Sequence, residues 1–303
     1  MEHWWGRAVA RSRRGLLLVA VITIGMTLGP ARAGAAGEAR APAVPRSAEG
    51  GEPEGAGGGA ASGTEEDALV AALKHDAILH PDDAETHYRL GLALRAARRR
   101  PESVASFERA AALGPTRDRL LDLGVAYTDV SRFGEAETAY RRLLAGSPAD
   151  ADALLNLANI SLRRGAFEAA IEQYRQALSS NPRYLFAWYH LGHTLKFVGR
   201  AAEARDAYKR VLELTPANER EQAARVDALY QLGSMELARG KALSAEAYFA
   251  EVTRIAPAHH GAHWGRAQAL LRLDRKDEAR QEIDAHTRLL AERAPTGPSA
   301  TTP

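Results

Sequence analysis

The chain has 303 residues, 26% of them charged, and it contains no cysteine, which excludes disulfide frameworks, thiol catalysis and cysteine-ligated zinc. Its formal charge of +2 depends on residues 1–33, which hold five arginines and one glutamate, so the rest of the chain carries about −2. Neither value gives the basic surface that nucleic-acid binding requires, and we expect no nucleic-acid partner.

Residues 1–33 have the three-part layout of a secretory signal peptide. Four arginines precede an apolar run at 15–28, and residues 31–33 (Ala-Arg-Ala) place small side chains where a signal peptidase cleaves. As a helix this run would reach only about 21 Å, less than the ~30 Å of a bilayer core. We therefore expect cleavage and an exported protein, periplasmic or extracellular, with no membrane association in its mature form. The alternative is an uncleaved membrane anchor.

The pair Arg13-Arg14 also resembles a twin-arginine export signal. An arginine-rich leader in an arginine-rich protein explains the same residues. Both export routes therefore stay open at this point.

Two segments are predicted to be disordered. Residues 34–64 hold nine glycines, nine alanines and three prolines, too little apolar surface to offset the entropy of ordering. Residues 294–303 form a Pro/Ser/Thr-rich tail. Between them, residues 65–293 are the expected folded part. It opens with a helix over 65–79 that Thr64 would cap and that Leu69 and Leu73 would pack.

Two independent markers repeat along the folded part with the same period. Leu-Gly or Leu-Ala pairs begin at 90, 123, 157, 191 and 232. Prolines lie 34, 33, 34, 34 and 41 residues apart, at 81, 115, 148, 182, 216 and 257. A regular period of 34 residues indicates a repeat architecture.

With each Leu-Gly pair placed at positions 7 and 8, the repeats start at 84, 117, 151, 185, 226 and 260. Position 8 is always glycine or alanine, and position 20 is alanine or serine. Position 24 is aromatic in five of six repeats although aromatics are only 6% of the chain. The aromatic residues are Phe107, Tyr140, Tyr174, Tyr208 and Phe249.

This pattern resembles the tetratricopeptide repeat (TPR) family, whose unit is a helix-turn-helix of 34 residues. The resemblance implies an all-α, right-handed superhelical solenoid of about six repeats after an N-terminal capping helix. Small residues at positions 8 and 20 would let helices A and B of a repeat approach closely. The aromatic at position 24 would fill the wedge between neighbouring repeats.

The gap of 41 residues adds seven residues within 217–225, and these include neither glycine nor proline. Seven residues make about two helical turns, so an apolar face would return nearly in phase. We predict that helix A of the fifth repeat begins about two turns early, near Asn218. Asn218 would cap this helix, with Glu221 three residues later.

No nucleotide-binding, zinc-protease or nucleophile-elbow motif is found in the sequence. Acidic pairs lie at helix starts, where the helix dipole explains them. We therefore predict a non-enzymatic protein that needs no cofactor.

In the TPR family, fixed positions of helix A face a concave groove that holds a peptide or protein partner. Carried over to this sequence, these positions predict a polar and aromatic partner-binding wall, and solvated surface or core is the alternative for each member. The candidates are Tyr88, Arg89, Asp122, Asn156, Asn159, Tyr189, His190, His193, Lys196, Tyr230, Gln231 and Trp264. The resemblance thus predicts an interaction scaffold, the leader predicts its export, and family analogy adds a role in envelope assembly.

Two alternatives of other classes remain. His259 and His263 have the i, i+4 spacing of two-histidine metal sites, so a metal-binding or small-ligand protein is one alternative. No third ligand is near them in sequence, so we expect no metal. The second alternative is a structural protein whose repeats stack end to end.

Overall fold

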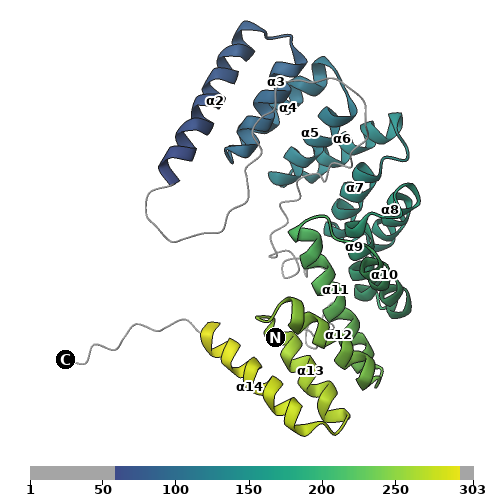
Figure 1. Ribbon diagram of the computed structural model, residues 1–303. Coiled ribbons are helices and arrows are strands. Elements are labelled where there is room, and N and C mark those ends of the chain that lie inside the picture. The colour runs from purple at the N-terminus through teal and green to yellow at the C-terminus, as the bar shows by residue number, and fades with distance from the viewer. Residues whose placement is uncertain (1–58, 294–303) are drawn as a thin grey trace, which may run out of the picture. The chain divides into compact units, whose positions relative to one another are not determined.

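The computed structural model describes residues 59–293, and all thirteen elements in that range are α-helices (Figure 1). A first helix, α2 (Gly59–Leu79), is followed by pairs in which an A helix packs against the B helix after it. The A helices are α3 (Ala84–Ala96), α5 (Arg117–Asp129), α7 (Ala151–Arg163), α9 (Leu185–Phe197), α11 (Glu219–Ala238) and α13 (His260–Arg272). The B helices are α4 (Arg100–Leu113), α6 (Phe133–Gly146), α8 (Phe167–Ser180), α10 (Ala201–Glu213), α12 (Ala242–Ile255) and α14 (Lys276–Arg293). The predicted all-α architecture of helix pairs is confirmed.

The chain divides into two compact units, with the boundary between Ile160 and Ser161 inside α7. In the first unit, α5 packs against both α4 and α6. In the second unit, α11 contacts the A helices α9 and α13 as well as the B helices α10 and α12. The A helices of the second unit therefore form a layer in which α11 is central.

The predicted signal peptide, most of the predicted linker and the predicted C-terminal tail lie outside the described residues. Between residues 59 and 293, no helix combines the length and the apolar character that crossing a bilayer requires.

Helix α2 is longer than expected, because it begins at Gly59 and not after Thr64. Val70 and Leu73 are buried against leucines of α3, whereas Leu69 is 46% exposed. The expected packing role of Leu69 was therefore wrong. Residues 70 and 73 are three apart and share a helix face, while residue 69 is rotated about 100° from residue 70.

Each turn from helix A to helix B contains one residue in the left-handed region, with φ between 58° and 82°. The N–H of the following residue bonds back to the last turn of helix A, for example from Arg99 to the carbonyl of Leu94 at 2.8 Å. This is the hydrogen bond that ends a helix in a tight turn. The six left-handed residues are Arg98, Ser131, Gly165, Gly199, Gly240 and Asp274.

The aromatic at position 24 lies against the small residue at position 8 of its own repeat. A Cβ atom added to Gly124 would lie 2.4 Å from Cε1 of Tyr140, and one added to Gly192 would lie 2.8 Å from Cε1 of Tyr208. The expected close approach of helices A and B is confirmed. Phe249 also lies against the next A helix, where a Cβ on Gly265 would be 2.5 Å from its ring. The ring of Phe249 therefore packs both within its own repeat and against the next repeat.

The early start of α11 is confirmed. Oδ1 of Asn218 accepts a hydrogen bond from the N–H of Glu221 at 3.0 Å. In return, Oε2 of Glu221 accepts from the N–H of Ala217 at 2.7 Å. The seven inserted residues therefore lengthen the helix, because the cap satisfies its first amides two turns earlier.

Candidate functional site

In the first unit, Asp122 of α5 joins two side chains of α3. The hydroxyl of Tyr88 donates to Oδ2 of Asp122 at 2.6 Å, and Nη1 of Arg95 donates to Oδ1 at 2.9 Å. Asp122 is only 6% exposed. We predicted Asp122 as a partner-binding residue, but the structure places it between two helices, where it holds Tyr88 and Arg95 in position. Arg89 is exposed on α3.

Asn156 and Asn159 lie on α7, and both are half-buried. Nδ2 of Asn156 donates to the main-chain oxygen of Asp152 at 2.9 Å, one turn earlier in the same helix. This bond fixes the amide of Asn156 along the helix surface.

In the second unit, Asp227 of α11 collects hydrogen bonds from two helices. Nε2 of His193 lies 2.9 Å from Oδ2 of Asp227, and the hydroxyl of Tyr189 donates to the same oxygen at 3.1 Å. Nε2 of Gln231 donates to Oδ1 at 3.3 Å. Burial opposes ionisation of Asp227, but the bonds from His193, Gln231 and Tyr189 outweigh it, so the pKa of Asp227 is lowered. Asp227 is therefore ionised at neutral pH.

Lys196 continues this network at its exposed edge. Its Nζ donates to Oε1 of Gln231 at 2.5 Å, which links α9 to α11 a second time. The side chain of Lys196 remains exposed. Burial lowers the pKa of Lys196, and the nearby charge of Asp227 opposes that shift. The amine is thereby held at a fixed place on the surface.

His190 was predicted to contact a partner, and the structure places it in the core instead. It is 4% exposed, and its ring stacks on Tyr174 at 6.0 Å and on Phe186 at 6.2 Å between centroids. Its Nε2 is buried without a hydrogen-bond partner. Burial, aided by nearby His193, lowers the pKa of His190 to about 3, so the ring is neutral at physiological pH.

Two further aromatic candidates, Trp264 and Tyr230, lie on α13 and α11. Trp264 is 41% exposed, and its ring centroid lies 5.4 Å from that of His286. Tyr230 of α11 is half-buried, and its ring centroid lies 4.8 Å from that of His259. We use the name A-helix surface for six polar and aromatic side chains that come from the A helices α9, α11 and α13. Its members are Tyr189, His193, Lys196, Tyr230, Gln231 and Trp264.

The two histidines that could suggest a metal have protein partners. Nδ1 of His259 accepts from the N–H of Ala262 at 3.0 Å and caps α13. The nitrogens of His263 lie 2.5 Å from Oε2 of Glu282 and 2.8 Å from the carbonyl oxygen of Pro257. Within residues 59–293, no three His, Asp or Glu side chains are grouped to hold a metal ion.

Asp227 was absent from the residues selected from the sequence. It occupies position 2 of the fifth repeat, one of the positions that face the groove in the family, so its position could have identified it. Its partners could not have been named from the sequence, because Tyr189 and His193 lie 38 and 34 residues away.

Known structures share the fold of this chain. The structure of MamA aligns with a TM-score of 0.52 and 23% identity, over 63% of this chain and 100% of that one. YrrB, described as a TPR protein with an unusual peptide-binding site, aligns with a TM-score of 0.52 and 19% identity, over 62% of this chain and 93% of YrrB. A tetratricopeptide repeat protein from Parabacteroides merdae reaches 0.54 at 20% identity, over 70% of this chain and 81% of its own.

Sequence comparisons give the family. The small glutamine-rich tetratricopeptide repeat-containing protein 2 of Mycosarcoma maydis is 32% identical over 87 residues, which cover 29% of this chain. The matched stretch spans only 25% of that relative. A family model described as tetratricopeptide repeat matches residues 66–118, 121–184 and 230–298, and a second with the same description matches 187–218. Because these matches cover more than half of the chain, it belongs to the tetratricopeptide repeat family, whose members are protein-interaction scaffolds.

Proposed function

We propose that the protein is a non-enzymatic scaffold whose A-helix surface binds an extended segment of a partner protein. The observation that carries this proposal is the network around Asp227, which fixes His193 and Gln231 while the cation of Lys196 stays exposed. Side chains that are already ordered lose little entropy when a partner binds.

The chemistry of this surface suits a peptide with an acidic or carboxylate group. Lys196 offers a charge-assisted hydrogen bond to an anion. The exposed ring of Trp264 offers an apolar contact of the kind that often dominates binding energy. YrrB, which shares the fold, is described as having a peptide-binding site, and this supports a peptide as the ligand class.

A peptide selected from a display library of random twelve-residue sequences against the full chain would test the surface. We expect Lys196→Ala and Trp264→Ala each to weaken binding of such a peptide about tenfold, or ~1.4 kcal/mol. Isothermal titration calorimetry gives the dissociation constants.

The control is Glu172→Ala, which removes an exposed side chain from the B helix α8 and should change affinity less than twofold. Melting temperatures of all three variants should match that of the unmodified protein. Equal affinity of the Lys196 and Trp264 variants and the unmodified protein would exclude the A-helix surface as the binding site.

We propose also that the protein is exported, which would place the scaffold among proteins outside the cytoplasm and is compatible with a role in envelope assembly. The support is the leader at residues 1–33. Mass spectrometry of protein expressed from its full gene should find a new N-terminus near residue 34. An intact N-terminus in the cytoplasmic fraction would contradict export, and an intact N-terminus in the membrane fraction would identify an anchor.

A further inference from the structure

A base at the start of helix B pairs with a glutamate three residues later in four repeats. These pairs are Arg99–Glu102, Arg132–Glu135, Arg200–Glu203 and Arg275–Glu278, with N–O distances of 2.7, 2.9, 2.7 and 2.5 Å. In the second unit, Glu203 also binds Arg175 of the preceding B helix at 2.6 Å. The glutamate therefore neutralises bases from two neighbouring B helices.

The third repeat has neither residue, with Ala166 and Ala169 at these positions, and the fifth repeat has only the base. Lys241 occupies the position of the base, but the residue three places later is Ser244. Lys209 of α10 occupies the position that Arg175 has in the preceding repeat. Among residues 59–293, no carboxylate lies within ion-pair distance of Lys209 or Lys241. The fifth repeat therefore has the cations of this arrangement without its carboxylate.

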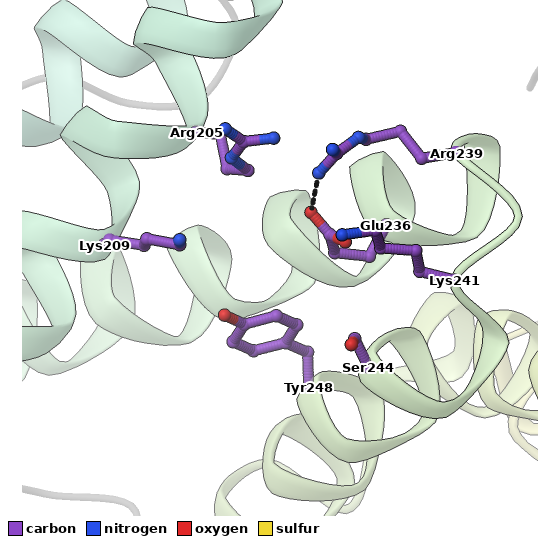
Figure 2. A pocket seen from close by; sticks show the side chains of 7 residues that line it. All are labelled: Arg205, Lys209, Glu236, Arg239, Lys241, Ser244 and Tyr248. Atoms are coloured by element: carbon purple, nitrogen blue, oxygen red, sulfur yellow. Dashed lines mark hydrogen bonds and ion pairs between the residues drawn. The ribbon is translucent and has the colours of Figure 1, made fainter.

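These residues line a cavity of about 280 Å³ between α10, the end of α11 and the start of α12. Figure 2 shows the side chains of the three helices around a common space. Four cations line it against a single carboxylate, and that carboxylate, Glu236, is bound by Arg239 at 2.8 Å. The cationic residues are Arg205, Lys209, Arg239 and Lys241. We call this cavity the basic pocket.

The basic pocket also offers hydrogen-bond donors. Nε of Arg205 is buried without a hydrogen-bond partner, and Oδ1 of Asp206 lies 3.8 Å from it, beyond hydrogen-bonding distance. Burial, together with the negative charge of Glu236, raises the pKa of Tyr248, so its hydroxyl keeps its proton. Lys209 and Lys241 are exposed, and their ammonium groups are donors that an anion in the pocket can reach.

We propose that the basic pocket binds a phosphate group, either as free phosphate or as a small phosphate monoester. A doubly charged oxyanion with three terminal oxygens replaces the missing glutamate and accepts from several donors at once. The volume lies just below the ~300 Å³ at which pockets for larger ligands begin, which suits a small anion. The site uses α10, α12 and the end of α11, so it is separate from the A-helix surface.

Titration calorimetry of the full chain at pH 7.5 tests the proposal, with inorganic phosphate, phosphoserine and chloride at matched ionic strength. We expect saturable binding of phosphate or phosphoserine at one site and none of chloride. Tighter binding of phosphoserine identifies a monoester as the ligand, and tighter binding of inorganic phosphate identifies the free ion. Equal heats for phosphate, phosphoserine and chloride overturn the proposal.

Ser244→Glu supplies the carboxylate that four other repeats carry and should weaken phosphate binding at least tenfold while circular dichroism stays unchanged. The double variant Lys209→Ala/Lys241→Ala should lose binding to a similar extent. Arg254→Ala removes an exposed base of the same helix α12, outside the pocket, and should stay within twofold. Undiminished binding by either pocket variant would overturn the assignment.

Discussion

Replacing Gly124 by leucine is expected to lower the free energy of unfolding of the first unit by about 3 kcal/mol. Even a Cβ atom at this position would lie 2.4 Å from Cε1 and 2.5 Å from Cζ of Tyr140. Tyr140 is 1% exposed within a cluster of buried side chains, so the ring cannot move aside without displacing its neighbours. Helices α5 and α6 would have to separate. Urea unfolding followed by circular dichroism measures the loss.

Gly146→Ala is the matched control, because a Cβ atom there meets nothing within 4 Å. Gly146 is the last residue of α6, and alanine should be neutral or stabilise by about 0.5 kcal/mol through its helix propensity. Unfolding of the leucine variant at the same urea concentration as the unmodified protein would show that the close helix contact is not required.

Asp227→Ala is expected to destabilise the second unit by about 3 kcal/mol. The variant leaves the hydroxyl of Tyr189, the ring of His193 and the amide of Gln231 without their shared acceptor. It should also weaken peptide binding, since Lys196 is held through Gln231. Urea unfolding and the peptide titration give both quantities.

The contribution of Asp227 to the stability of the fold should fall as the pH is lowered. Its pKa is lowered in the folded protein, so the unfolded chain binds a proton first as the pH falls below about 3.8. The stabilisation by Asp227 is complete above that pH. It is lost as the pH falls through the lower pKa that Asp227 has in the folded protein. Asp284→Ala, an exposed residue of α14, is the control and should change stability by less than about 0.5 kcal/mol. A constant difference between Asp227→Ala and the unmodified protein from pH 7 to pH 2 would contradict the ionic role.

The two proposed sites use different positions of the same repeat. Asp227 is one of four acidic residues at position 2 of the six repeats, and it lies between two A helices, where it fixes polar groups of the A-helix surface. Ser244 stands where four other repeats have a glutamate, and it lies beside Lys209 and Lys241. Asp227 orders a surface through hydrogen bonds, whereas Ser244 leaves two cations that an anion can bind.

The sequence by itself determined the helix pairs, the phase of the repeats and the early start of α11. Each depends on residues that act locally: glycine at position 8, an aromatic sixteen residues later, and a cap such as Asn218 within one turn of the amide it binds. The same pattern placed the candidates of the fourth repeat, Tyr189, His190, His193 and Lys196, on its helix A, because the phase of the repeat fixes which residues that helix contains.

Only the tertiary structure decided which of these side chains are accessible and what they bind. His190 has the spacing of a surface residue, yet Tyr174, sixteen residues earlier, and Phe186 cover it. Asp122 was predicted to contact a partner, but Tyr88 and Arg95 of the preceding A helix occupy both of its oxygens. Burial and pairing depend on where residues of separate helices meet in space, and helical periodicity carries no information about that.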